Sequence, residues 1–285
     1  MNQKLRTLLV LARVSNLPTV WSNCLAGWWL CGGGDYWRLP LVLLGVGALY
    51  TGGMFLNDAF DVDFDRQRRP TRPIPSGAIT EELAWVYGWT WLALGILILI
   101  ICGKVTGALA VVLAVCIVVY DASHKAITAS PWLIGLCRFW VYVIAGTIGQ
   151  YAFNGWPIWC GAAMAFYIVG LSYVARRESF RGPLPYWPLL FLAVPLLLAV
   201  LMNQNEARKP AMVISVVLVL WILRCVRTIF FGGELMVGRI VSGLLAGIIL
   251  VDWLAVSPGC PVILDVTFVI LFAVTLVLQR FIPAT

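Results

Sequence analysis

Residues 57–65 read NDAFDVDFD and lie where a long apolar run gives way to an arginine-rich segment. If a helix continues through this stretch, Asp58, Asp61 and Asp65 stand at positions i, i+3 and i+7. At about 100° per residue, these three carboxylates share one face of the helix. Three like charges on one face repel each other, and a divalent cation such as Mg²⁺ would relieve that repulsion because it takes oxygen ligands and shares carboxylates with phosphates.

The neighbouring residues support this prediction but leave one alternative open. Asn57 stands at the edge of the same face, whereas Asp63 points to the opposite side. The alternative is a solvated acidic helix end that the following arginines, residues 66–72, balance electrostatically. The membrane context described next favours a functional site, because ionisable groups at the end of a spanning helix that face a bundle interior usually have a function.

The composition predicts a polytopic membrane protein. The chain has 285 residues, of which 61% are hydrophobic and 12% are charged, and its mean hydropathy is +0.92. Such values exclude a soluble domain. The net charge of +7 does not indicate nucleic-acid binding, because the basic residues fall in short breaks between apolar segments. We therefore expect an all-α integral membrane protein in which residues 1–285 form a single transmembrane domain.

Ten apolar stretches are long enough, or nearly long enough, to span a bilayer as helices. Nine spans are the alternative, because the last two stretches lie close together. The architecture predicted in either case is a bundle of transmembrane helices around a central cavity. The stretches cover residues 8–31, 39–60, 83–103, 105–120, 131–152, 156–175, 184–202, 210–230, 235–256 and 262–281.

The basic residues predict the orientation of the bundle. One set of helix ends carries 16 lysines and arginines, and the opposite set carries only four, namely Arg38, Lys104, Arg208 and Lys209. Because positively charged loops stay inside, the first set should face the cytoplasm. Residues 57–65 lie on that side. We expect an integral protein of the bacterial inner membrane with its active-site loops in the cytoplasm.

The first apolar stretch carries a polar stripe. Arg13, Asn16, Thr19 and Asn23 stand at positions i, i+3, i+6 and i+10. Polar groups are costly in hydrocarbon, so this stripe should face the bundle interior or a wet cavity. Hydrogen bonding between helices is the alternative explanation. Asn16 is a candidate substrate-binding residue on the first interpretation.

Further polar residues lie on the same side of the membrane. The break between the fourth and fifth stretches contains Tyr120, His124 and Lys125, and His124 is expected to be a loop residue at the interface. Arg138 lies one or two turns inside the fifth stretch and needs an anionic partner. Arg72 either closes over a diphosphate through bidentate contacts or serves as a positive anchor on the inner side.

These residues resemble a known family. The patterns N-D-x-x-D-x-x-x-D at residues 57–65 and R-P-I-x-x-G at residues 72–77 resemble the first signature of the UbiA superfamily of intramembrane prenyltransferases. The resemblance covers most of the chain. Residues 120–125, the pair Cys137 and Arg138, and residues 279–281 are most similar to the EboC-type branch.

The resemblance implies a helical bundle whose cavity opens laterally to lipid. Mg²⁺ held by two acidic motifs would bind a polyprenyl diphosphate, and an acceptor would capture the allylic cation after ionisation. Asp58, Asp61 and Asp65 match the catalytic residues of the first motif. Arg72 matches the arginine that follows that motif, and Lys125 matches a basic loop residue that contacts the diphosphate.

The chain departs from the family at its second motif. The usual pattern is a pair of aspartates, whereas this chain has Arg176, Arg177 and Glu178. A second Mg²⁺ beside fixed cations is electrostatically unfavourable, so we predict fewer metal ions, with an arginine on the diphosphate instead. The candidate metal ligands are Asn57, Asp58, Asp61, Asp65 and Glu178. The candidate substrate-binding residues are Asn16, Asn57, Arg72, Tyr120, Lys125, Arg138, Arg176 and Arg177.

The function predicted is the Mg²⁺-dependent transfer of a polyprenyl group from its diphosphate to a small acceptor within the membrane. The chemistry is consistent with the residues, because metal ions and arginines stabilise a leaving diphosphate and a dry cavity protects the cation. Two alternatives stay open. One is a terpene cyclase of the same superfamily, and the other is a non-catalytic relative that binds or transports lipids.

Overall fold

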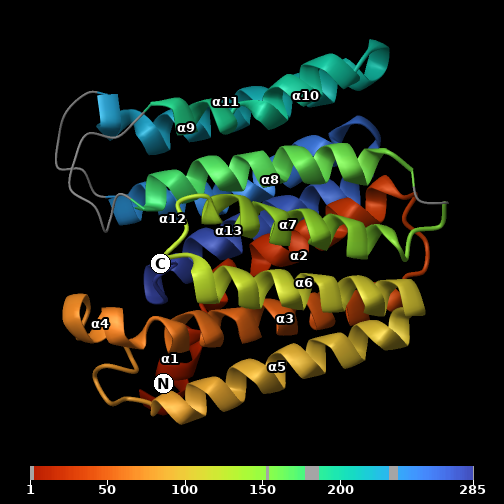
Figure 1. The fold of residues 1–285 in the computed structure, drawn as a ribbon. Helices are drawn as coiled ribbons and strands as arrows, with labels where there is room; N and C mark the ends of the chain where they lie inside the picture. The colour runs from red at the N-terminus through yellow and green to blue at the C-terminus, as the bar shows by residue number, and fades with distance from the viewer. Residues whose placement is uncertain (1–2, 152–153, 177–185, 231–236, 285) are drawn as a thin grey trace.

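A computed structural model describes residues 3–151, 154–176, 186–230 and 237–284 of the chain. All regular secondary structure in these ranges is helical. Seven helices are long and apolar enough to cross a membrane, and two shorter apolar helical segments cover residues 130–146 and 187–202. Figure 1 shows them side by side in one bundle, with both described ends of the chain at the same end of it. The all-helical fold is as predicted.

The helices follow the predicted apolar stretches closely, except for the first stretch. Their bounds are α1 (Gln3–Leu11), α2 (Leu17–Leu30), α3 (Arg38–Phe60), α4 (Val62–Arg68), α5 (Glu81–Cys102), α6 (Lys104–Ser123), α7 (Ser130–Gly146), α8 (Trp156–Ala175), α9 (Trp187–Phe191), α10 (Val194–Met202), α11 (Arg208–Phe230), α12 (Val237–Val256) and α13 (Val262–Phe281). Short 3₁₀ turns cover residues 14–16, 205–207 and 257–259.

Local sequence signals define the ends of α5. Thr80 is its N-cap, and the side-chain oxygen accepts a hydrogen bond from the backbone N–H of Leu83 at 3.3 Å. Glu81 and Glu82 place negative charge in the first turn, where it interacts favourably with the helix dipole. Gly103 ends the helix with φ 151°, a conformation that residues with a Cβ rarely adopt.

The first predicted stretch is not one continuous helix, which corrects the sequence-based expectation. Arg13 has φ 43° in the left-handed region, and a 3₁₀ turn then leads into α2. A non-glycine residue in this region is strained and needs support from its surroundings. That support comes from the Arg13 side chain, which donates hydrogen bonds to Asn57 and Asp58 at the end of α3.

Glycines allow α3 and α5 to approach each other closely. A Cβ added at Gly52 would lie 2.8 Å from the carbonyl oxygen of Gly88, and one at Gly95 would lie 2.7 Å from that of Gly45. Real side chains do not approach backbone atoms this closely. These four glycines therefore form a backbone-to-backbone seam between α3 and α5, as small residues commonly do in membrane helices.

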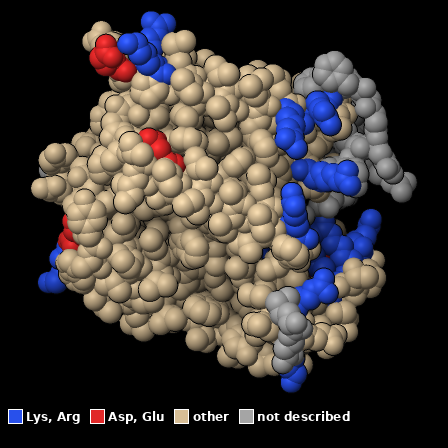
Figure 2. All heavy atoms as spheres, turned by 180° about the vertical axis from the view of Figure 1, so that it is seen from behind, with Lys and Arg blue, Asp and Glu red and all other residues tan. Residues whose placement is uncertain are grey.

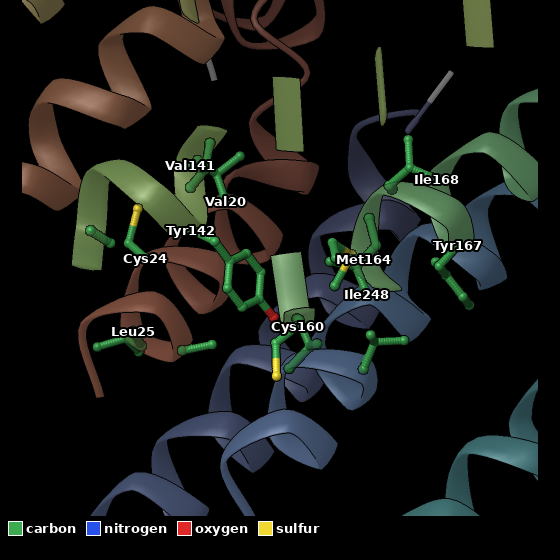
Figure 3. Packing of buried hydrophobic residues seen from close by; sticks show 14 of the residues in the cluster. Val20, Cys24, Leu25, Val141, Tyr142, Cys160, Met164, Tyr167, Ile168 and Ile248 are labelled. Atoms are coloured by element: carbon green, nitrogen blue, oxygen red, sulfur yellow. The ribbon is translucent and has the colours of Figure 1, made fainter. Parts of the chain in front are cut away.

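The apolar core lies around α2, which contacts α3, α7, α8, α12 and α13. Figure 3 shows side chains from α2, α7, α8 and α12 meeting in this core, among them Val20, Val141, Met164 and Ile248. Met164 and Ile248 are fully buried. This core packs α2, α7, α8 and α12 against one another. The site described next lies at one end of the bundle.

Candidate active site

The predicted carboxylates lie where α3 meets α4. The helix α3 ends at Phe60, Asp61 is its C-cap, and α4 begins at Val62. Helical hydrogen bonds nevertheless cross the junction, because the N–H of Asp61 donates to Asn57 O and that of Asp65 donates to Asp61 O. The carboxylates consequently keep nearly helical spacing.

The exposure of these aspartates follows the predicted pattern. Asp58 and Asp61 are 7% exposed and Asp65 is 1% exposed, whereas the side chain of Asp63 is 87% exposed. Asp63 pairs with the exposed Arg66, at 3.1 Å, and has no other ion pair among the described residues. The inward and outward faces are therefore those expected from the helical spacing.

Two arginines bind the carboxylates directly. One Nη of Arg72 lies 3.0 Å from Asp58 Oδ1 and 3.2 Å from Asp65 Oδ2. One Nη of Arg13 lies 3.2 Å from the same oxygen of Asp58 and 3.2 Å from Asn57 Oδ1. Arg72 therefore bridges the first and last aspartates, which places both on one side of the chain.

The loop between α6 and α7 supplies two more cationic or polar groups. Lys125 Nζ lies 2.7 Å from Asp61 Oδ1, and 4.3 Å from the ring centre of Phe64. His124 Nε2 lies 3.3 Å from the same Asp61 oxygen, and its Nδ1 is 3.1 Å from the carbonyl oxygen of Asp121. The expectation that His124 is only an interfacial loop residue missed its contact with Asp61.

Burial and charge act in opposite directions on the carboxylates outside the spanning segments. Burial would raise the pKa of Asp61, but hydrogen bonds from His124 and Lys125 outweigh it and lower that pKa overall. Burial raises the pKa of Asp65, because the opposing charge of Arg72 only partly compensates. Burial also lowers the pKa of Arg72, with the neighbouring Arg13 adding to the effect. Asp61 is therefore more firmly ionised than Asp65, because its pKa is lowered whereas that of Asp65 is raised.

A cavity of about 220 Å³ adjoins these residues, because it is lined by Arg13, which pairs with Asp58, and by Asn57. Its polar end is formed by Arg13, Asn57 and Asp121, and the Asn57 amide donates to Asp121 Oδ1 at 3.2 Å. Apolar side chains from α2, α3, α6, α7, α8 and α12 line the rest. A charged group at one end and hydrocarbon along the walls would suit a substrate with an anionic head and an apolar tail. Asn16, Tyr120 and Arg138 also line this cavity.

The polar stripe of the first stretch faces the interior, as expected. Asn16 donates to Ala284 O at 2.9 Å, and Arg138 donates to the Oγ1 of Thr19 at 3.1 Å and to Asn23 Oδ1 at 2.6 Å. Both predicted uses of the stripe therefore occur, since these residues line a cavity and also join helices. No direct ion pair of Arg138 with a carboxylate occurs among the described residues.

The anionic partner expected for Arg138 is reached through an intermediate residue. Asn23 donates to both oxygens of Asp252 at 2.8 Å, while Ser22 and Tyr142 donate to the same carboxylate. Asp252 is fully buried. The sequence alone did not indicate this role for Asp252.

Arg176 lies at the end of α8 and contacts the loop that carries His124 and Lys125. It donates to the backbone carbonyls of His124, Ile127 and Thr128, at 2.7 to 2.9 Å, and to the hydroxyl of Ser130. These contacts hold the loop between α6 and α7. The other two residues of the predicted second motif, Arg177 and Glu178, lie outside the described residues.

Sequence reasoning did not single out two further residues of the site. Asp121 is 3% exposed and contacts Asn57, and Arg13 contacts both Asn57 and Asp58. A signal existed for Asp121, because it stands four residues before Lys125 and therefore at the same helix end. Arg13 was visible in the polar stripe, but nothing in the stripe indicated its partner.

Comparison with known proteins shows which family the chain matches. The UbiA prenyltransferase family model matches residues 17–257. The digeranylgeranylglyceryl phosphate synthase of Ignicoccus hospitalis is 37% identical over 122 residues, which are 43% of this chain and 40% of that protein. The chain spans at most half the length of the curated relatives it matches.

Solved structures agree with the fold. The apo structure of a UbiA homologue from Aeropyrum pernix K1 has a TM-score of 0.70 and 15% identity, covering 90% of this chain and 98% of that one. A UbiA homologue from Archaeoglobus fulgidus bound to GPP and Mg²⁺ has a TM-score of 0.62 and 15% identity, covering 98% of this chain and 100% of that one. At this identity the likeness shows the fold alone.

Proposed function

Because this chain belongs to the UbiA prenyltransferase family, we infer that it transfers a polyprenyl group from a prenyl diphosphate to a small acceptor within the membrane. The observation that carries this inference is the position of the carboxylate site, which we define as Asp58, Asp61 and Asp65 with Arg72 and Lys125. It adjoins the polar end of a cavity with largely apolar walls, because Arg13 lines that cavity and pairs with Asp58. A prenyl diphosphate combines the same two properties in one molecule.

The residues present fit Mg²⁺ as the cofactor. The buried oxygens Asp65 Oδ1 and Asp121 Oδ2 lack hydrogen-bond partners among the described residues, and carboxylate oxygens are the ligands that Mg²⁺ prefers. The described residues contain no ready-made cluster of three or more His, Cys, Asp or Glu side chains for a metal. Mg²⁺ would therefore be shared with the diphosphate of the substrate. Asn57, Asp58, Asp61 and Asp65 would hold it.

Mg²⁺ would supply Lewis-acid stabilisation of the leaving diphosphate when bound. Arg72 and Lys125 would bind the oxygens of that diphosphate and orient it, since both already lie beside the carboxylates, at Asp58 and at Asp61. Binding would exchange their carboxylate partners for phosphate oxygens. The apolar walls would exclude water and so protect the allylic cation until the acceptor reacts with it.

The remaining candidate residues have more distant roles in this proposal. Asn16, Tyr120 and Arg138 line the cavity and would contact the substrate or the acceptor there. Arg177 and Glu178 stay predictions, as does the use of fewer metal ions than the family's two acidic motifs would hold. Arg176 is already engaged with loop carbonyls.

We also infer that the carboxylate site faces the cytoplasm, because its helix ends carry the excess of positive charge. Figure 2 shows many of the lysines and arginines gathered at one end of the molecule. The relatives named above come from archaea, so the bacterial inner membrane stays a prediction. Labelling of single cysteines placed in the loop of residues 66–77, from outside intact cells, would contradict this orientation.

The decisive experiment incubates the full chain in nanodiscs with Mg²⁺ and labelled prenyl diphosphates of several lengths, followed by mass spectrometry of the lipid extract. Acceptors with a glycerophosphate group are the first to test, because the curated relatives are named for such a product. A prenylated acceptor is the result expected. A cyclic product formed without acceptor would indicate a cyclase instead, and unchanged diphosphate would indicate a non-catalytic lipid-binding protein.

A further inference from the structure

A second cavity lies at the basic end of the bundle, between α11, α12 and α13. Its volume is about 630 Å³, and four arginines from these three helices line it. We call it the arginine pocket and define it by Arg224 and Arg227 of α11, Arg239 of α12 and Arg280 of α13. All four arginines are exposed.

No arginine of this pocket forms an ion pair with a carboxylate in the described part of the chain. Arg224 lies over the ring of Trp221, at 5.5 Å from its centre. Four like charges around one hollow repel each other unless an anion lies between them. The positive-inside rule requires only that these arginines lie on the inner side, not that they surround a common cavity.

The walls of the pocket are mixed in character. Trp221, Ile240 and Leu276 supply apolar surface, and the described polar groups largely satisfy one another: Gln279 donates to Ser242 O at 3.1 Å, and Trp221 donates to Gly243 O at 2.8 Å. The arginines are therefore the main polar groups left for a ligand. Guanidinium groups suit phosphate oxygens because their planar donors can bind two oxygens at once.

The arginine pocket adjoins the cavity of about 220 Å³ described above. Ala284 lines both cavities, and its carbonyl oxygen accepts the hydrogen bond from Asn16. One short segment after α13 thus separates the two. We propose that the arginine pocket binds the phosphate head group of an amphiphile, whose apolar part lies along α12 and α13. An anionic bilayer lipid and a phosphate-bearing acceptor share this chemistry.

The test uses the full chain in detergent, stripped of lipid and offered equal amounts of phosphatidylglycerol and phosphatidylcholine. Native mass spectrometry should show preferential retention of phosphatidylglycerol by the wild type. The double variant Arg239→Gln/Arg280→Gln should retain about a hundredfold less, since the loss of each charged hydrogen bond weakens binding by about tenfold. The matched control Arg208→Gln/Lys209→Gln removes two charges at the opposite end and should retain the lipid fully.

Two further arms complete the test. Arg239→Lys/Arg280→Lys keeps the charge and should recover most of the binding, which separates loss of the site from loss of the fold. Displacement by millimolar glycerol phosphate would identify a free phosphate as a sufficient ligand, whereas failure to displace would identify a lipid-borne one. Equal loss in the matched control, or no preference for phosphatidylglycerol in the wild type, would overturn the proposal.

Discussion

The carboxylate site and the arginine pocket lie at the same end of the bundle, yet they use arginine in opposite ways. Arg72 in the carboxylate site and Arg13 beside it are partly buried and ion-paired with aspartates. In the arginine pocket the guanidinium groups are exposed and have no carboxylate partner among the described residues. The first arrangement is close to electrically neutral, whereas the second carries a net positive charge.

This difference predicts two ways of binding an anion. A diphosphate that enters the carboxylate site must take the place of the aspartates in their existing ion pairs. A cation is then needed to neutralise the aspartates that have lost their partners. A phosphate entering the arginine pocket would replace no carboxylate among the residues that the structure describes, and would need no metal. We therefore expect arginine to serve a metal-dependent site and a metal-independent one, according to the residues beside it.

The largest effect is expected from the carboxylate site itself. Asp58→Asn removes the charge that accepts both Arg13 and Arg72, and we expect turnover to fall by about 10²–10³-fold, as for other preorganised electrostatic contacts in active sites. Asp63→Asn is the matched control, because that side chain points to solvent. Turnover of labelled prenyl diphosphate measures both. Equal rates for the two variants would remove the distinction between the inner and outer faces.

A second prediction tests whether Arg72 competes with a metal ion. Arg72→Gln leaves Asp58 and Asp65 without their shared cation, so Mn²⁺ binding in the absence of substrate should become tighter. The kcat/KM for prenyl diphosphate should fall by about tenfold, because a charged hydrogen bond is lost. Electron paramagnetic resonance of bound Mn²⁺ measures the affinity. Arg280→Gln frees no carboxylate, and a gain in Mn²⁺ affinity there would contradict the comparison.

The smallest effect concerns an arginine that belongs to neither region. Arg176→Lys keeps the charge but loses most of the bonds to the carbonyls of residues 124–128, so this loop should exchange its amide hydrogens a few-fold faster. Hydrogen-exchange mass spectrometry without substrate provides the measurement, with the opposite-end variant Arg38→Lys as control. Unchanged exchange together with reduced turnover would favour the sequence-based prediction, in which Arg176 contacts the diphosphate.

Much of the fold could be predicted because long apolar stretches leave few alternatives to spanning helices. The exception is the break at Arg13. The nearest proline, Pro18, lies five residues later, and the left-handed backbone at Arg13 depends on its bonds to Asn57 and Asp58. These partners are more than forty residues away in sequence. Local patterns cannot reveal strain that only a distant contact relieves.

The residues of the site also fall into those that local sequence predicts and those that depend on distant contacts. The inward face of Asp58, Asp61 and Asp65 followed from helical spacing alone. The contacts of His124 with Asp61 and of Asp252 with Asn23 join separate helices, and both residues look ordinary in their own segments. A lone histidine in a loop and an aspartate near the end of an apolar stretch each have a simple local explanation, so tertiary structure was needed to identify them.

The glycine seam between α3 and α5 has a consequence for substrate length. With backbone against backbone at Gly52 and Gly95, α3 cannot slide along α5 without a clash. The carboxylates at the end of α3 therefore keep a fixed position relative to α5. For the proposed prenyl diphosphate substrate, a longer chain could not be accommodated by moving the head group outward. The distance from the carboxylates to the far end of the cavity would then set the longest chain that fits.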